Sequence, residues 1–398
     1  DRGMRCRLSW RPPGLRPPSW GVIAASDSVA TGVRQSTARR RIKKIVRHWW
    51  TVASGLIKHL SGKLSEGPDL KASVIIRTLN EARHLDDLLL MIARQRTVDL
   101  DVEVVLVDSG STDGTLAIAA RRGCRIERIA KAEFSFGRSL NRGCAASAGD
   151  ILVFISGHCV PVRDDWLQAL CQPLIDGRAA YAYGRQIGDD DSNYSERRIF
   201  AKYFPDRSAI PQDGFLCNNA NAALLRSAWE THRFDEELTG LEDMELAKRL
   251  GARGLAIGYV AEAPVFHHHQ EDWAAIRRRF EREALALRSI MPEVHLSRLD
   301  VLRYIVSSVY GDWRSAARLG IRSTSRMDML RYRYHQFVGA YLGNHEHRRL
   351  SQAAKERFYY PLVDRKAELD DWLGPLRRSP PHEGQQSAGE GQEFQTSR

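Results

Sequence analysis

The fold is decided by SVIIRTLNE (73–81) and VEVVLVDSGSTDGT (102–115), two apolar runs that each end in polar residues. A strand covered on both faces of a sheet reads as a continuous apolar run, so both segments predict buried strands. The periodicity predicts further elements: helices at 85–93, 112–122 and 138–146, and strands at 125–129 and 151–155. This alternation predicts an α/β fold with a mainly parallel sheet and helices on both faces, followed by a helical C-terminal region.

The composition is that of an ordinary globular protein, but its charge is unevenly distributed. Hydrophobic residues make up 43% of the 398 residues, which is enough for a sizeable core. The first 69 residues carry 14 lysines and arginines against 4 acidic residues, whereas the other 329 carry 46 against 45. Because the net charge of +11 belongs almost entirely to the N-terminal part, we expect no nucleic-acid partner for the α/β region.

Cysteine usage and hydropathy indicate a cytoplasmic protein. No CxxC pair or zinc-like spacing occurs, which favours buried thiols in a reducing compartment. The six cysteines are Cys6, Cys124, Cys144, Cys159, Cys171 and Cys217. No run of about 18 apolar residues predicts a spanning helix, and the first residues lack the apolar core of a secretory signal. We assign no function to residues 1–35, in which the first methionine is Met4.

Residues 39–64 predict a basic amphipathic helix. Apolar residues recur there every three or four positions, and lysines and an arginine fill the opposite face. Such a helix either lies in an anionic interface, at the inner face of the cytoplasmic membrane, or docks on the α/β domain. The predicted organisation is a basic extension (1–69), an α/β domain (70–290), a helical region (291–378) and a disordered polar tail (379–398).

Polar residues follow three of the predicted strands: Thr78, Asn80 and Glu81 the first, Asp108 and Ser109 the second, and Ser156 and His158 the fourth. Ligands of parallel sheets bind at the carboxyl ends of the strands. A carboxylate there, followed by Gly and Ser or Thr, suits the base or ribose of a nucleotide. The alternative is turn and cap chemistry by Ser111, Thr112 and Asp113.

Four segments in this order resemble the family 2 glycosyltransferases of the GT-A fold: VIIRTLNE, VVLVDSGSTDGT, GDILVFI with a polar triplet before Pro161, and GLEDMELAKRL. The resemblance covers about residues 72–270, and the aromatic, basic C-terminal part is similar to that of rhamnosyltransferase-like members. It implies a nucleotide-diphosphate sugar donor, with Thr78, Glu81 and Asp108 holding the nucleoside. It also implies positions near the nucleotide or its phosphates for Arg138 and Asn141.

The chain departs from this family at the metal motif, where Asp-x-Asp is replaced by Ser156-Gly157-His158. A neutral imidazole adds no negative charge, and Mg²⁺ prefers oxygen ligands. We expect either a divalent cation, Mn²⁺ or Mg²⁺, held by His158, His267 and His269, or no metal and a direct bond from His158 to the diphosphate. Without a metal, one or two of the arginines at 277–288 would neutralise the diphosphate, and a solvated role is expected for most of the others.

A second acidic site is Glu242–Asp243. A helix beginning at Thr239 or Gly240 would place both acids in its first turn, where the helix dipole stabilises them, so a purely structural role is open. The resemblance implies instead that Asp243 takes the proton from the acceptor hydroxyl of an inverting reaction, with Glu242 beside it.

The segment before these acids is the expected acceptor side. The resemblance implies that Asn218, Asn219 and Asn221 line the acceptor or sugar pocket, whereas Asn-rich turns also occur without a ligand. Trp229 is expected in the core.

The implied function is inverting transfer of a hexose or deoxyhexose from a nucleotide-diphosphate sugar to a hydroxyl of a saccharide or lipid-linked acceptor, in polysaccharide or glycolipid synthesis. The alternative is a non-catalytic nucleotide-sugar-binding or partner-binding protein with a degenerate metal motif. A dinucleotide-dependent oxidoreductase is disfavoured because no GxGxxG follows the first strand.

Overall fold

A computed structural model of the chain describes residues 70–189, 192–269, 271–321 and 325–345. The predicted amphipathic helix at 39–64 and the predicted tail at 379–398 lie outside these residues. The division of the chain into an α/β domain ending at residue 290 and a helical region beyond it stays a prediction.

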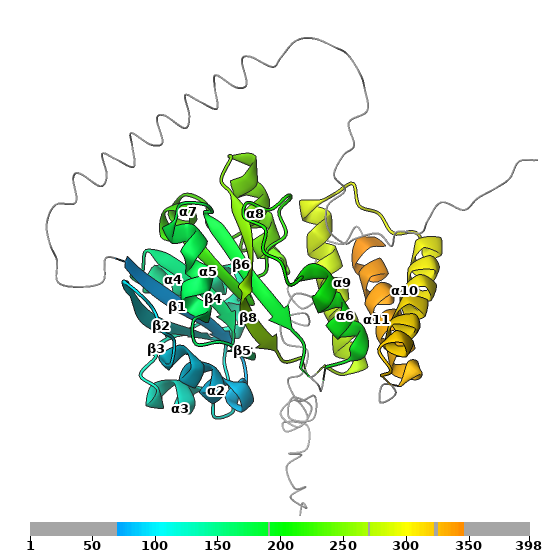
Figure 1. Cartoon of the computed structure of the whole chain (residues 1–398), viewed down its shortest axis with the longest axis horizontal. Coiled ribbons are helices and arrows are strands. Elements are labelled where there is room, and N and C mark those ends of the chain that lie inside the picture. The colour runs from blue at the N-terminus through cyan, green and yellow to red at the C-terminus, as the bar shows by residue number, and fades with distance from the viewer. Residues whose placement is uncertain (1–69, 190–191, 270, 322–324, 346–398) are drawn as a thin grey trace, which may run out of the picture. The chain divides into compact units, whose positions relative to one another are not determined.

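An eight-stranded sheet forms the centre of the described region (Figure 1). Its first half is parallel, in the order β3 (Arg125–Arg128), β2 (Leu100–Asp108), β1 (Leu70–Thr78), β4 (Ile151–Ser156). Its second half is mixed, in the order β7 (Asn221–Leu225), β6 (Tyr181–Ile187), β8 (Ile257–His267), β5 (Cys159–Pro161). β7 runs antiparallel to both β4 and β6, and β6 runs parallel to β8. The α/β fold class is confirmed, and the antiparallel strand β7 is an addition to the predicted pattern.

Alternate side chains of β1 enter two different cores, which explains its unbroken apolar run. Val74 and Ile76 belong to the core cluster with α2 (Ala82–Ala93), α3 (Thr115–Arg121) and α5 (Trp166–Ile175). Ile75 belongs to the cluster with α4 (Phe136–Ala146), α7 (Arg226–Thr231) and α8 (Glu242–Ala252). Trp229 is 2% exposed within this second core, as predicted.

Three helices begin at other residues than the periodicity predicts, among them α4, which begins at Phe136 rather than at residue 138. α2 begins at Ala82 rather than at residue 85. α3 begins at Thr115 rather than at residue 112, because Asp113 Oδ1 accepts the Thr115 N–H at 2.9 Å and holds the preceding residues in a turn. Such side-chain bonds are invisible to an analysis of apolar spacing.

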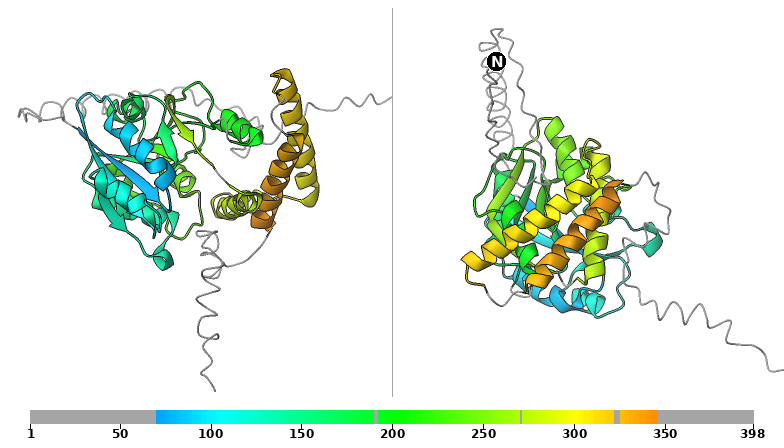
Figure 2. Two further views of the ribbon diagram at one scale, coloured as in Figure 1. Left: turned by 90° about the horizontal axis from the view of Figure 1, so that it is seen from below. Right: turned by 90° about the vertical axis from the view of Figure 1, so that its right-hand side faces the viewer.

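The remaining helices are a short 3₁₀ turn η1 (Lys131–Glu133), α6 (Tyr194–Tyr203), α9 (Trp273–Ile290), α10 (Arg298–Arg318) and α11 (Arg326–His345). α11 packs closely along α9 (Figure 2). Any side chain at Gly339 or Gly343 would overlap the carbonyl groups of Arg277 and Glu281 on α9, so glycine permits this approach. Among the described residues, no helix is both long and apolar enough to cross a membrane.

Candidate functional site

The carboxyl ends of β1 and β2 lie next to each other, with Thr78 in register with Asp108. The Thr78 hydroxyl donates to Asp108 Oδ1 at 3.3 Å. The other carboxylate oxygen accepts the backbone N–H groups of Gly110 and Ser111 at 2.9 and 3.0 Å. Asp108 is only 2% exposed. Its carboxylate shapes the loop that follows β2 through these hydrogen bonds.

Asn80 joins the loop after β1 to the loop after β2. Its Oδ1 accepts the Thr112 N–H at 2.8 Å, and its own N–H donates to the Ser111 hydroxyl at 2.9 Å. The φ of Asn80 is 58°, in the left-handed region that asparagine tolerates better than most residues. The Ser109 hydroxyl adds a bond of 3.1 Å to the Thr78 carbonyl. The predicted nucleoside-binding residues thus hold two strand-end loops together.

Glu81 reaches past Gly157 to His158. Glu81 Oε1 lies 2.8 Å from His158 Nδ1. A Cβ atom on Gly157 would be 2.7 Å from Glu81 Cγ, so a larger residue would displace the carboxylate. Burial disfavours the charged form of His158, but the Glu81 carboxylate outweighs this effect and raises the pKa of His158 above its ordinary value. At the position where the resemblance implies Asp-x-Asp, this chain places a histidine with a carboxylate behind it.

Three histidines from two distant segments meet at this point. One ring nitrogen from each of His158, His267 and His269 lies within 4.8 Å of the other two. The Nε2 atoms of His158 and His267 are 3.1 Å apart. β5 and β8 produce this proximity, because their antiparallel pairing sets Cys159 opposite His267. The structure therefore brings together the three predicted metal ligands.

Each of these rings is held through its Nδ1 atom. The partner oxygens are Glu81 Oε1 for His158, Gln186 Oε1 for His267 at 2.7 Å, and Glu196 Oε1 for His269 at 2.8 Å. An acceptor at Nδ1 fixes the proton there and leaves Nε2 available as a ligand, which is the usual arrangement around a metal-bound histidine.

The facing Nε2 atoms of His158 and His267 lie close enough to share a proton or a cation. Two lone pairs 3.1 Å apart repel each other unless a proton or a cation lies between the atoms. Burial and the neighbouring histidines lower the pKa of His267 well below its ordinary value, so this imidazole is neutral, as a metal ligand must be. The residues fit a divalent transition metal better than Mg²⁺, which prefers oxygen ligands.

A second acidic group is already neutralised by an arginine. Glu196, His269 and Glu271 also offer ligand atoms within 4.8 Å of one another. Arg279 Nη2, however, lies 2.7 Å from a carboxylate oxygen of each glutamate. A cation here would compete with this guanidinium. Arg279 is therefore not among the solvated arginines, since its side chain is only 16% exposed.

Glu242 and Asp243 form the first turn of α8, as expected from their spacing. The helix begins later than Thr239 or Gly240, because Leu241 adopts the left-handed conformation with φ 57°. Glu245 Oε1 accepts from Arg249 Nε at 2.7 Å, an i,i+4 pair within the same helix.

Asp243 lies beside the carboxyl end of β4. Its Oδ2 accepts the backbone N–H of Asn219 at 2.8 Å, and the next residue, Ala220, accepts the backbone N–H of Ser156 at 3.3 Å. Burial and the adjacent Glu242 raise the pKa of Asp243 to about 7. A carboxylate with this pKa is ready to accept a proton near neutral pH.

Arg77 is a site residue that carries no signal in the sequence, because it lies inside the apolar run of β1. Its Nη1 is 3.4 Å from Glu242 Oε1. The guanidinium groups of Arg77 and Arg282 lie 4.9 and 4.8 Å from the centre of the Phe136 ring. Arg282 Nε is buried without a hydrogen-bond partner, and Arg282 lies beside Gly240. Two positive side chains therefore converge near the acids that open α8.

Arg138 and Asn141 make internal contacts. Arg138 Nε donates to Glu236 Oε2 at 2.8 Å. The Asn141 amide donates to Glu236 and to the Phe234 carbonyl, and its oxygen accepts from the Trp229 indole at 3.0 Å. These bonds give Asn141 a complete set of partners within the protein.

The three predicted pocket asparagines differ in their surroundings. Asn221 is fully buried, and its side chain bonds to the Trp166 indole and two backbone carbonyls. Asn218 is partly exposed, and its oxygen accepts the Ala220 N–H. Asn219 is buried, and its Nδ2 has no hydrogen-bond partner. Asn219 therefore offers an unused donor next to Asp243.

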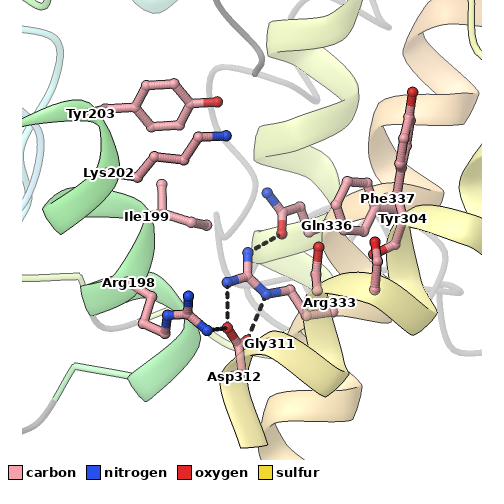
Figure 3. Close-up of a pocket in the computed structure, with 12 residues that line it drawn as sticks. Arg198, Ile199, Lys202, Tyr203, Tyr304, Gly311, Asp312, Arg333, Gln336 and Phe337 are labelled. Atoms are coloured by element: carbon pink, nitrogen blue, oxygen red, sulfur yellow. Dashed lines mark hydrogen bonds and ion pairs between the residues drawn. The ribbon is translucent and has the colours of Figure 1, made fainter. Parts of the chain in front are cut away.

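A cavity of about 220 Å³ lies between α6, α10 and α11, lined by none of these residues (Figure 3). Asp312 in its wall accepts from Arg333 Nε at 2.7 Å and from Arg198 Nη1 at 2.9 Å. The same carboxylate accepts from the Ser195 hydroxyl at 2.6 Å. This buried network fastens α6 to α10 and α11.

Comparison with known proteins finds a family match that includes Thr78, Asp108 and His158 and ends before Asp243. Residues 73–233 match the family described as Glycosyl transferase family 2. The O-antigen chain rhamnosyltransferase WbaN of Salmonella anatum is 30% identical over 44% of this chain and 60% of its own length. The O-antigen chain rhamnosyltransferase RfbN of Salmonella typhimurium strain LT2 is 28% identical over 50% of this chain and 67% of its own.

The chain thus spans 60% of the first of these relatives. Among solved structures, the mannosyltransferase PcManGT from Pyrobaculum calidifontis in complex with GDP-Man and Mn²⁺ is 17% identical. The match covers 75% of this chain and 92% of that one, with a TM-score of 0.47. The four segments in the sequence and the α/β sheet agree with this match of residues 73–233 to glycosyl transferase family 2.

Proposed function

We propose that the protein is an inverting glycosyltransferase that moves a hexose or deoxyhexose from a nucleotide-diphosphate sugar to a hydroxyl of a saccharide or lipid-linked acceptor, in polysaccharide or glycolipid synthesis. The observation that carries this proposal is the buried Asp243 carboxylate, whose pKa is raised to about 7 beside the strand ends of the sheet. A purely structural helix-start acid would gain nothing from such a raised pKa.

Asp243 is the proposed general base. It takes the proton of the acceptor hydroxyl as that oxygen attacks the anomeric carbon, while the bond from this carbon to the diphosphate breaks. Such assistance typically accelerates a reaction by about 10²–10⁴. Glu242, held by Arg77, keeps a second negative charge close by and thereby raises the pKa of the base.

The departing diphosphate needs positive charge, and two sources are available. Arg77 and Arg282 converge near the acids of α8 and can form bidentate contacts to phosphate. His158, His267 and His269 would hold a divalent cation, which would supply Lewis-acid stabilisation of the diphosphate. Glu81, Gln186 and Glu196 orient these ligands through their Nδ1 atoms.

On the donor side, Thr78 and Asp108 are proposed to meet the nucleoside, with Asn80, Glu81, Ser109 and Ser156 shaping the surrounding loops. The internal contacts of Arg138 and Asn141 favour a positioning role behind this site. On the acceptor side, the unused Asn219 Nδ2 makes this residue the best candidate of the three asparagines. Peripheral contact with the inner face of the cytoplasmic membrane would suit a lipid-linked acceptor.

The test is a panel of nucleotide-diphosphate sugars, deoxyhexose donors included because two relatives are rhamnosyltransferases. Each donor is assayed by thermal shift and by release of the nucleoside diphosphate, with and without Mn²⁺. Stabilisation at a hundredfold excess over Kd should be about 2.7 kcal/mol. We expect one donor both to stabilise the protein and to be slowly turned over. Binding without any turnover would instead support a non-catalytic nucleotide-sugar-binding protein.

The role of the histidines is tested by His158→Ala, with His268→Ala as the matched control. His268 is adjacent in sequence to the proposed ligands, but its ring stacks on His84 and bonds to Asp189. We expect His158→Ala to abolish the response to Mn²⁺ and His268→Ala to preserve it. An unchanged response in His158→Ala would remove the metal from the proposal and leave the arginines to neutralise the diphosphate.

A further inference from the structure

The exposed apolar side chains of this protein are concentrated on two helices. Fourteen large apolar residues are exposed within the described part of the chain, and ten of them lie between residues 298 and 345. They are Leu299, Leu302, Val306, Tyr310, Trp313, Leu319, Met327, Leu330, Tyr334 and Leu342. Exposed apolar surface this concentrated marks an interaction site rather than ordinary surface composition.

Five of these ten residues form a continuous stripe on α10. Leu299, Leu302, Val306, Tyr310 and Trp313 follow one another at steps of three or four, the spacing that lines one face of a helix. The first four are 79%, 61%, 61% and 60% exposed. Val309, Asp312 and Ala316, on the neighbouring face of the helix, are buried. The apolar side of α10 therefore faces away from the protein core.

Exposed arginines outnumber acidic residues on these two helices. Six exposed arginines lie on α10 and α11: Arg298, Arg303, Arg314, Arg318, Arg326 and Arg331. The three acidic residues described on these helices are less accessible. Asp312 is buried in the network with Arg333, Asp300 bonds to the helix-capping Ser297, and Asp328 lies 3.7 Å from Arg331. The exposed face is thus apolar and cationic.

The two helices present this face as one rigid unit. α10 and α11 run side by side on the side of the molecule nearest the viewer in the right-hand view of Figure 2. Trp313 Nε1 donates to the Arg326 carbonyl at 3.3 Å, and Arg298 Nε lies 3.3 Å from the Tyr341 hydroxyl, so the pair is joined near both ends. The buried Asp312 network fastens the pair to α6 (Figure 3).

We propose that the exposed apolar stripe of α10, together with the exposed apolar residues of α11 and the arginines around them, binds an anionic lipid bilayer. Leucine, valine, tryptophan and tyrosine side chains would enter the interface, and the arginines would contact acidic headgroups. A second copy of the chain fits less well, because an antiparallel pairing of two α10 helices about their centres would set Arg303 against Arg314 without a carboxylate between them. This surface is separate from residues 39–64, and its binding does not depend on the proposed activity.

The experiment is cosedimentation of the full chain with vesicles of phosphatidylcholine and with vesicles containing phosphatidylglycerol. We expect binding only to the anionic vesicles and weakening with salt. Two variants test the two parts of the surface: Leu302→Glu with Val306→Glu, and Arg314→Gln with Arg318→Gln. Each exposed arginine near an anionic surface contributes enough that losing two should weaken binding roughly thirtyfold. The apolar variant should reduce binding at least as much.

Matched controls distinguish this surface from a general effect. Val98→Glu changes an apolar residue that is 71% exposed elsewhere, and Arg94→Gln with Arg253→Gln removes two other exposed charges. These controls should bind vesicles like the native protein, and unchanged thermal unfolding should show that all variants fold. Full binding by both surface variants, or its loss only when Lys43 and Lys44 are replaced, would overturn the proposal. So would a dimer in solution that Leu302→Glu with Val306→Glu converts to a monomer.

Discussion

Asp243 meets two demands that a surface carboxylate does not meet. It is held in one orientation by the Asn219 and Met244 N–H groups, each at 2.8 Å, and its pKa is raised to about 7 by burial and by Glu242. The two hydrogen bonds and the positive charge of Arg77 oppose this rise. These opposing effects leave the pKa of Asp243 near neutral pH. The carboxylate is therefore ionised there and can still accept a proton.

This balance predicts the pH dependence of catalysis. The base must be ionised, so kcat/KM should fall about tenfold per pH unit below about pH 7. Arg77→Gln removes a charge that lowers the pKa of Asp243, and should move this acidic limb to higher pH. Arg77→Lys, which keeps the charge, should leave the limb near its original position. Steady-state pH profiles measure both effects, and an acidic limb that stays in place in Arg77→Gln would separate Arg77 from the base.

The site residues that were predicted and those that were missed differ in their position relative to the apolar runs of the sequence. Thr78, Asp108 and Asp243 stand at the ends of apolar runs or in a quoted segment of the family, so the sequence displays them. Arg77 and Phe136 stand inside strand and helix patterns, and only their approach to Glu242 and Arg282 in space reveals them. The predicted histidines required the pairing of β5 with β8 to meet.

At the scale of elements, α9 and α11 pack against each other at a distance that Gly339 and Gly343 permit. Gly343→Ala would force a Cβ onto the Glu281 carbonyl, and overpacking of this kind costs about 1–3 kcal/mol. Gly251→Ala in α8 is the matched control, because its Cβ would enter open space. That variant should be neutral or stabilising by about 0.5–1 kcal/mol.

Chemical denaturation measures both glycine variants. We expect the free energy of unfolding to fall in Gly343→Ala and to hold or rise in Gly251→Ala. Equal stability of Gly343→Ala and the native protein would show that α11 is not packed against α9 as described.

At the scale of the whole molecule, the parallel half of the sheet was predictable because β1, β2 and β4 each contain a continuous apolar run. The mixed half was not, because β7 is the short segment NAALL and its neighbours differ in length and direction. This second half nevertheless supplies His267, Asn219 and, through the loop before α8, Asp243. The sheet thus joins a donor-side half, whose main strands can be predicted from the sequence, to a second half whose strands can be predicted only in part.

The central claim is that Asp243 is the general base, and the most direct measurement compares turnover with donor affinity in Asp243→Asn. The account predicts that kcat falls about 10²–10⁴-fold while the Kd for the donor is unchanged within about threefold. Glu245→Gln, two residues further along the same helix, should retain native turnover. Native turnover in Asp243→Asn, or an equal loss of donor binding, would contradict the account.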